Sequence, residues 1–364
     1  MSDTKIDESG PETTLIDLRN AERGGAVRRL LRAQSFQILL VLLVIVAIFS
    51  AIAPDYFAQL SNFRLIVQNA SILAVIGVGM TFIIITSGID LSVGSVLVFS
   101  GVVAAMVMRA IGGDGWGVAF IGIVVAILSG LAWGILNGVL IAKAKVPPLI
   151  VTLGSMGMAL GFAQILTGGI DIREAPAVLS DVIGYGNVLG TVPVLSVIAL
   201  VIVVIGAIVL HYTRFGRYTY AVGSSEEASR RVGVKVDRHL IKVYALSGAL
   251  SGFAGILSLA QFNTTAIAGQ STTNLNVIAA VVIGGTSLFG GLGTIFGTVV
   301  GLFIPAVLQN GFVITGVQPF WQQVAVGAVL IVAVYVDQAR RSSALRGGQS
   351  TSSLWRRLVT RSPK

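Results

Sequence analysis

The chain has 364 residues, of which 54% are apolar and 11% are charged, and its mean hydropathy is +0.88. A soluble domain averages roughly 25% charged residues, so this composition excludes a water-exposed globular fold and indicates an all-α polytopic membrane protein. Cysteine is absent, which excludes disulfides and thiolate metal sites. The formal net charge is +9, and the positions of the basic residues decide its meaning.

The first element is a polar leader, residues 1–35, which ends in a basic segment at residues 28–32. This leader is too long for a secretory signal peptide, so the apolar run that follows is interpreted as an uncleaved first span. The basic segment is either an interfacial elbow or a solvated tail. The predicted domains are therefore a polar tail at 1–35, a transmembrane domain at 36–338 and a basic tail at 339–364.

Apolar segments recur along the rest of the chain, each close to the roughly 20 residues that a bilayer requires. The count is about ten, or eight to ten with re-entrant segments, because 64–109 and 274–309 each read as two spans or as a broken helix. The expected spans are residues 36–53, 64–86, 91–109, 116–142, 147–167, 192–210, 241–262, 274–290, 291–309 and 320–337.

The basic residues follow this topology. With a cytoplasmic N-terminus, the leader, the 143–145 turn, the 211–242 connection and the tail from 338 all face the cytoplasm. Only Arg64, Arg109 and Arg173 of the 25 Lys and Arg residues fall elsewhere. The pattern obeys the positive-inside rule and predicts that both termini are cytoplasmic. No basic face with interleaved aromatics exists, so a nucleic-acid partner is not expected.

Glycines recur at intervals of four in several predicted spans. Residues four apart share one helix face, so each set predicts either a groove for a neighbouring helix or a path for solute. The sets are Gly130, Gly134 and Gly138; Gly157 and Gly161; Gly248 and Gly252; and Gly293, Gly297 and Gly301.

Two polar, glycine-containing breaks interrupt the apolar pattern. Residues 86–95 contain Asp90, the only acid expected near membrane depth, where a charge is costly and usually functional. Asp90 or Ser92 can instead cap the next helix by accepting hydrogen bonds from its free N–H groups. Residues 284–294 form the second break, and paired breaks point to a pathway built on pseudo-symmetric repeats. The candidate break or pathway residues are Ser87, Asp90, Ser92, Gly285, Thr286 and Ser287.

The longest cytoplasmic connection, residues 212–242, contains a predicted short helix at 223–233. Ser224 or Ser225 can cap it, two glutamates suit its positive N-terminal end, and Gly233 can end it. A charged helix on an otherwise apolar protein suits docking to a soluble partner, and a plain surface loop is the alternative.

No catalytic chemistry is expected of this sequence. Its two histidines, His211 and His239, lie in or beside the basic connection, and no His/Asp/Glu cluster has metal-ligand spacing. No nucleophile–base set lies at membrane depth, and no Gly-x-x-x-x-Gly-Lys-Ser/Thr loop is present. The chain is therefore predicted not to be an enzyme, with no catalytic residue, metal or cofactor of its own.

Three blocks together resemble the permease subunits of ribose-type, monosaccharide ABC importers. They are VGMTFIIITSGIDLSVGSVLVFSG at 78–101, GRYTYAVGSSEEASRRVG at 216–233 and AAVVIGGTSLFGGLGTIFGTVVG at 279–301. The family implies a bacterial inner-membrane permease, paired as a homodimer or heterodimer. A cytoplasmic ATPase would hold ATP and Mg, and an extracytoplasmic binding protein would deliver a monosaccharide or related polyol. A stand-alone secondary transporter or channel for a small solute is the alternative.

The resemblance also implies roles for particular residues. Six residues match the loop that docks into the ATPase: Glu226, Glu227, Ala228, Arg230, Arg231 and Gly233. This chain reads Glu-Glu-Ala-Ser where members often have two alanines before the basic residue. Uncharged polar side chains in the spans suit weak sugar contacts, although such side chains more often make interhelical hydrogen bonds. These candidates are Asn69, Asn137, Gln164, Gln261, Asn274 and Asn276.

Overall fold

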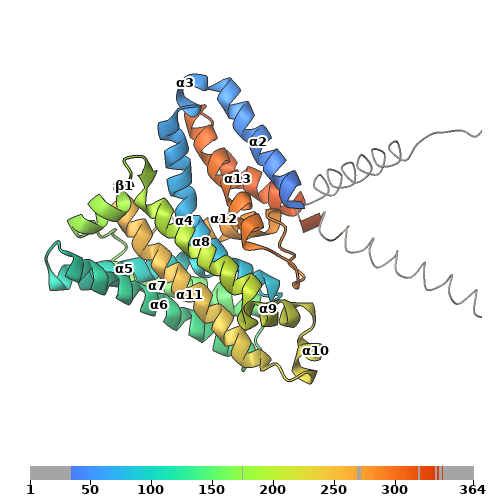
Figure 1. Cartoon of the computed structure of the whole chain (residues 1–364). Coiled ribbons are helices and arrows are strands. Elements are labelled where there is room, and N and C mark those ends of the chain that lie inside the picture. The colour runs from blue at the N-terminus through green and yellow to red at the C-terminus, as the bar shows by residue number, and fades with distance from the viewer. Residues whose placement is uncertain are drawn as a thin grey trace, which may run out of the picture.

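The computed structural model describes residues 34–338 apart from 174, 269–271, 319, 333 and 336–337. Both predicted tail domains, apart from the helical start at 34–35, lie outside the described residues, as does the basic segment at 28–32. The chain forms a helix bundle with one small hairpin (Figure 1). Its elements are α2 (Gln34–Ile52), α3 (Pro54–Phe57), α4 (Leu60–Ile85), α5 (Val93–Ile111), α6 (Trp116–Ala142), α7 (Pro148–Thr167), η1 (Leu179–Gly184), β1 (Asn187–Val188), β2 (Val192–Pro193), α8 (Val194–Tyr212), α9 (Arg214–Ser224), α10 (Glu226–Arg231), α11 (Val236–Phe262), α12 (Thr273–Ile283) and α13 (Ile295–Ile314).

Seven helices of the described chain are long and apolar enough to cross a membrane, namely α4, α5, α6, α7, α8, α11 and α13. This confirms a multi-pass helical protein. Three shorter apolar helices lie at residues 36–52, 273–283 and 320–332, so each predicted span coincides with a helix. A total of about ten spans and a cytoplasmic position for both termini stay predictions.

The sequence left two stretches, 64–109 and 274–309, as either two spans or a broken helix, and the structure gives a different answer for each. Residues 64–109 form two helices, α4 and α5, separated by the first break. The predicted span 274–290 is a broken helix, because α12 has only 11 residues. At 1.5 Å per residue it is about 16 Å long, against a bilayer core of about 30 Å. It ends where Gly284 and Gly285 follow, and Gly285 has φ of 95°, a conformation that favours glycine.

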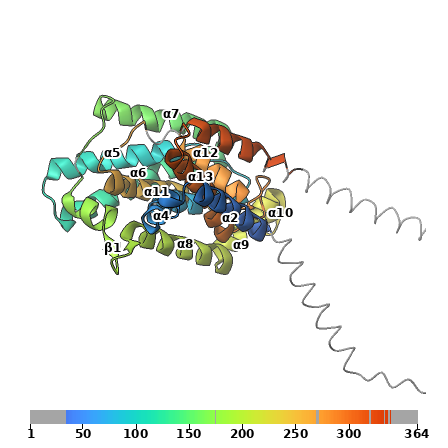
Figure 2. The ribbon, with the colours of Figure 1, turned by 90° about the horizontal axis from the view of Figure 1, so that it is seen from above.

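The helices lie in layers. Seen from above, α7 lies at one edge, α5 and α6 come next, α4 and α11 are central, and α8 lies at the opposite edge (Figure 2). Helix α11 packs against α4, α5 and α6. Helices α2, α3 and α13 gather on α4 as a second group (Figure 1). That group shares an apolar cluster that includes Phe49, Phe57, Ile66 and Val307.

Glycine contacts set the closest helix packing, between α6 and α11. A Cβ atom on Gly130 would lie 2.1 Å from the carbonyl oxygen of Gly248, and one on Gly134 would lie 2.3 Å from that of Tyr244. A Cβ atom on Gly252 would meet the backbone of Ala126 at 2.1 Å. The predicted grooves on both helices are therefore confirmed as helix–helix contacts.

Glycines also set a close contact between α12 and α13, whereas the glycines of α7 make no such contact. A Cβ atom on Gly297 would lie 2.0 Å from the carbonyl oxygen of Gly284, and Gly301 packs equally closely on α12. By contrast, Gly157 and Gly161 on α7 face open space. Their predicted groove is therefore empty in this chain.

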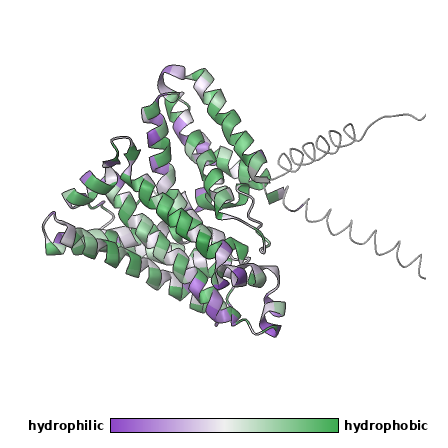
Figure 3. Cartoon of the chain, in the orientation of Figure 1, coloured by the Kyte–Doolittle hydropathy of each residue, from purple (hydrophilic) through white to green (hydrophobic). Residues whose placement is uncertain are grey.

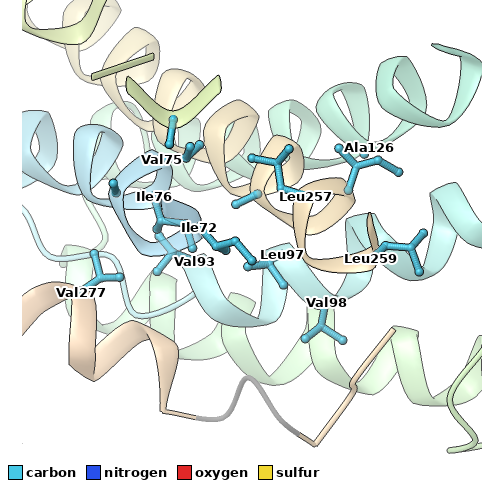
Figure 4. Packing of buried hydrophobic residues seen from close by; sticks show 14 of the residues in the cluster. Ile72, Val75, Ile76, Val93, Leu97, Val98, Ala126, Leu257, Leu259 and Val277 are labelled. Carbon is cyan, nitrogen blue, oxygen red and sulfur yellow. The ribbon is translucent and has the colours of Figure 1, made fainter. Parts of the chain in front are cut away.

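The largest buried cluster joins α4, α5, α11 and α12 through aliphatic side chains, including Ile76, Leu97, Leu257 and Val277 (Figure 4). Apolar residues cover the helices along their length, whereas polar residues gather at their ends and over α9 and α10 (Figure 3). Lipid is as apolar as leucine, so close packing rather than escape from water holds such helices together.

Candidate functional site

The predicted surface helix is present as α10, and α9 precedes it. Ser225, not Ser224, caps α10, because its Oγ accepts a hydrogen bond from the N–H of Ala228 at 3.2 Å. Gly233 follows with φ of 88° and lets the chain turn toward α11. The predicted helix, one of its two candidate caps and its terminating glycine are confirmed.

Two ion pairs lie along α10, each joining residues four positions apart. Glu226 binds Arg230 at 2.8 Å, and Glu227 binds Arg231. The Glu227 and Arg231 side chains are both 77% exposed, so this pair points into solvent. Each such exposed pair stabilises a helix by only about 0.3–0.5 kcal/mol, so both pairs remain available to a partner.

A third carboxylate attaches α10 to the rest of the bundle. Asp237, at the start of α11, accepts hydrogen bonds from Arg230 and, at 3.0 Å, from Lys145 in the turn between α6 and α7. The bonds from Asp237 and Glu226 raise the pKa of Arg230, so its charge is permanent. Three segments, α10, the start of α11 and the turn between α6 and α7, therefore meet at one carboxylate.

The two predicted breaks lie side by side, although about 200 residues separate them in sequence. The N–H of Gly291 donates to the carbonyl oxygen of Ile85 at 2.9 Å. The Oγ of Ser87 donates to the carbonyl oxygen of Phe289 at 2.9 Å. The first break ends α4 and the second precedes α13, so the two meet in space, which the sequence did not predict; the pathway on pseudo-symmetric repeats stays a prediction.

Helix α9 joins these breaks, and residues 85–88, 220–224 and 287–293 are called the α9 junction below. Tyr220 donates its hydroxyl to the carbonyl oxygen of Gly293 at 2.7 Å, and burial raises the Tyr220 pKa, so the hydroxyl stays a donor. The Oγ of Ser87 lies 3.3 Å from the carbonyl oxygen of Gly223. A Cβ atom on Gly223 would lie 1.7 Å from the carbonyl oxygen of Ile85, so only glycine fits.

A buried polar network lies beside the first break. Oδ1 of Asp90 accepts hydrogen bonds from the N–H and Oγ of Ser92, at 2.8 and 2.6 Å. Asn137 on α6 donates to Ser92 Oγ at 3.0 Å and accepts from Ser155 on α7. Burial raises the pKa of Asp90, a group in the connection between two spans, while the bonds from Ser92 lower it. The network links the break to α6 and α7.

The predicted cap of α5 is wrong in detail. Ser92 is the N-cap residue, but its side chain accepts no bond from the helix N–H groups. Asp90 accepts the N–H of Ser92 instead and closes a turn before the helix. The reason is the backbone of Ser92, whose φ of −84° and ψ of −13° are helical, whereas a capping residue has an extended backbone; its hydroxyl bonds Asp90 and Asn137 instead.

The predicted path residues divide into buried and exposed ones. Gln261 on α11 donates to Asn69 on α4 at 2.7 Å, and Asn274 donates to the carbonyl oxygen of Leu91 at 3.1 Å. Both Gln261 and Asn274 keep a buried amide oxygen without a hydrogen-bond partner in the described part of the chain. Asn276 is half-buried, and Gln164 is exposed, away from the rest.

The second break supplies Gly285, Thr286 and Ser287. Thr286 is buried, and its Oγ1 also has no hydrogen-bond partner among the described residues. The Oγ of Ser287 accepts the N–H of Phe289 at 3.3 Å. Sequence reasoning missed Tyr220, Gly223 and Asp237, whose roles depend on neighbours distant in sequence.

These features, a bundle of apolar spans, uncharged polar side chains within it and a charged helix tied to two breaks, define a membrane permease. The described residues contain no group of three His, Asp or Glu side chains that can hold a metal ion. The chain belongs to the permease family described as branched-chain amino acid transport system / permease component, matched over residues 62–334.

Curated relatives narrow the resemblance to sugar permeases. Over 309 residues the chain is 38% identical to the ribose import permease protein RbsC of Escherichia coli K12, covering 83% of this chain and 93% of that protein. It is 37% identical over 301 residues to RbsC of Bacillus subtilis, covering 82% and 91%. The fructose import permease protein FrcC of Rhizobium meliloti is 34% identical over 308 residues, covering 82% and 84%. No solved structure matches the chain. The resemblance to ribose-type permeases is confirmed.

Proposed function

We propose that this chain is the membrane-spanning subunit of an ATP-driven importer that carries a monosaccharide or related polyol into the bacterial cytoplasm. The relatives named for ribose and fructose, together with a D-allose transport system permease 34% identical to this chain, support a sugar. The chain would lie in the inner membrane beside a second permease, identical or related. A solute-binding protein would deliver the sugar from outside.

The α9 junction is the observation that carries the mechanism. A cytoplasmic ATPase would grip α10, whose exposed pair of Glu227 and Arg231 offers both signs of charge. When the ATPase subunits close on ATP, α10 and α9 move together. Because Tyr220 and Gly223 contact both breaks, that movement reaches the adjoining ends of α4, α5 and α13 at once. The pathway would then change from outward-facing to inward-facing.

The scarcity of buried charged side chains in the described residues supports an energy source outside this chain. Ion-coupled carriers place acids or broken-helix ion sites deep in the membrane. Asp90 is the only buried carboxyl group in the described residues, and its Oδ1 is bonded to Ser92. We therefore assign ATP and Mg to the partner ATPase and no cofactor to this chain.

Neutral polar side chains suit the solute. A sugar presents hydroxyl groups, which bind reversibly to amides and hydroxyls, and a charged site is unnecessary. The unpartnered amide oxygens of Gln261 and Asn274, and the hydroxyl of Thr286, are buried acceptors that a sugar hydroxyl can reach when the pathway opens. We assign these three side chains to the pathway.

The test is uptake of labelled ribose, allose or fructose into proteoliposomes that contain the permease, its ATPase and its binding protein. We expect uptake that requires internal ATP and stops when the ATPase is left out. A protonophore should leave it unchanged. Uptake that persists without the ATPase and stops with the protonophore would favour a secondary transporter instead.

A further inference from the structure

A pocket of about 480 Å³ opens beside α9, apart from the α9 junction, and four cationic side chains line it. Arg214 begins α9, Lys235 lies in the link between α10 and α11, and Arg238 and Lys242 lie on the first turns of α11. No acidic side chain lines this pocket. Four positively charged side chains therefore line the same pocket.

The neighbouring carboxylates do not neutralise these cations. Glu226 and Glu227 bind the two arginines of α10, and Asp237 binds Arg230 and Lys145. Within the described residues, none of the four pocket cations makes an ion pair. Like charges gathered in a concave surface repel one another and attract an anion from outside.

Three aromatic side chains also line the pocket, and a hydrogen bond holds one of them in place. The His239 ring lies 4.8 Å from the ring of Phe215 and 6.2 Å from that of Tyr218, measured between centroids. A hydrogen bond of 3.1 Å joins His239 Nε2 to Thr219 Oγ1 and fixes α11 against α9. The pocket thus combines four cations with an aromatic and partly apolar lining, which suits an amphiphile better than a free inorganic anion.

The pocket lies beside the ends of two candidate spans, α8 and α11. Helix α8 ends at Tyr212, and α11 begins at Val236, immediately beside the lining residues. Tyr212 is exposed, as tyrosines at a membrane surface are. Toward the membrane, α8 exposes Leu200, Val204 and Ile208. Helix α8, which Thr213 joins to α9, therefore exposes an apolar face to acyl chains.

We propose that this pocket binds the phosphate group of an anionic phospholipid. Arginine and lysine form charge-assisted hydrogen bonds with phosphate oxygens, and basic pockets between membrane helices suit lipid head groups. The bound lipid would bridge Arg214 on α9 to Arg238 and Lys242 on α11. It would therefore hold α9 in place beside the α9 junction.

The test measures lipid retention by the full chain in detergent, using native mass spectrometry with phosphatidylglycerol and phosphatidylcholine at equal concentration. The wild type should retain phosphatidylglycerol in preference. Arg238→Gln and Lys242→Gln should each weaken that binding about fivefold, the effect of one basic residue near an anionic surface. Arg217→Gln is the matched control, because it removes one charge from α9 outside the pocket lining, and binding should be unchanged.

Four results would overturn the assignment. Equal retention of both lipids by the wild type would exclude a head-group site, and an equal loss in Arg217→Gln would indicate surface charge alone. Displacement of the lipid by millimolar inorganic phosphate would make a soluble anion the ligand. If Arg238→Gln lowered recovery of the ATPase while lipid retention stayed the same, the pocket would belong to the ATPase-docking surface.

Discussion

Substitution Gly223→Ala tests whether α9 touches the first break as closely as the structure requires. The new Cβ atom would lie 1.7 Å from the carbonyl oxygen of Ile85, against at least 3.4 Å for an ordinary contact, so the backbone must move by about 1.7 Å. Overpacking of this kind costs about 1–3 kcal/mol. The same movement breaks the hydrogen bond from Gly291 to Ile85, which costs about 1–3 kcal/mol more.

The matched control is Gly157→Ala, another Gly-to-Ala change within a helix. A Cβ atom on Gly157 meets nothing within 4 Å, so the change should be neutral or raise stability by about 1 kcal/mol. Thermal unfolding of both variants in detergent, followed by ATP-driven uptake in proteoliposomes, separates the two cases. Gly223→Ala should lower the midpoint by several degrees and reduce uptake. Equal midpoints for the two variants would refute the close approach at Gly223.

Three further substitutions probe the site. Asp237→Asn weakens the ion pairs that hold α10 to the bundle, and because these pairs are exposed, stability should fall by less than about 1 kcal/mol. Recovery of the ATPase in a pull-down should fall clearly, and unchanged recovery would contradict the anchoring role. Asn137→Ala removes the acceptor of the buried Ser155 hydroxyl and should cost about 1–3 kcal/mol. The exposed Gln164→Ala should change stability by less than about 0.5 kcal/mol, and similar unfolding midpoints would contradict the network. Ser225→Ala removes a cap worth about 1 kcal/mol, so hydrogen exchange at the start of α10 should accelerate, and unaltered exchange would argue against this cap.

The helices were largely predictable, because length and apolar character decide which segments cross a membrane. The errors fall where backbone conformation decides instead. Helix α12 stops at Ile283 because glycines follow, and a hydropathy pattern does not register that stop. Helix α11 begins at Val236, earlier than its apolar run, since Asp237 and Arg238 continue the helix outside the apolar segment.

The site was predictable only in part. The cap at Ser225 and the turn at Gly233 are local features, so residue type and spacing were sufficient. The partners of Asp237, Tyr220 and Asn137 lie on other elements, and no periodic pattern identifies them. A single sequence places polar residues in spans without showing which of them meet.

The conformation of Ser87 links the first break to a mechanical role. Its φ is 62°, a region that disfavours residues with a side chain, so a glycine would adopt it with less strain. A serine nevertheless provides the hydroxyl that reaches Phe289 in the second break and Gly223 on α9. Strain is thus accepted at the residue that connects all three segments. In the importer that we propose, energy would arrive through α10, and this connection would carry the movement of α9 to the spans.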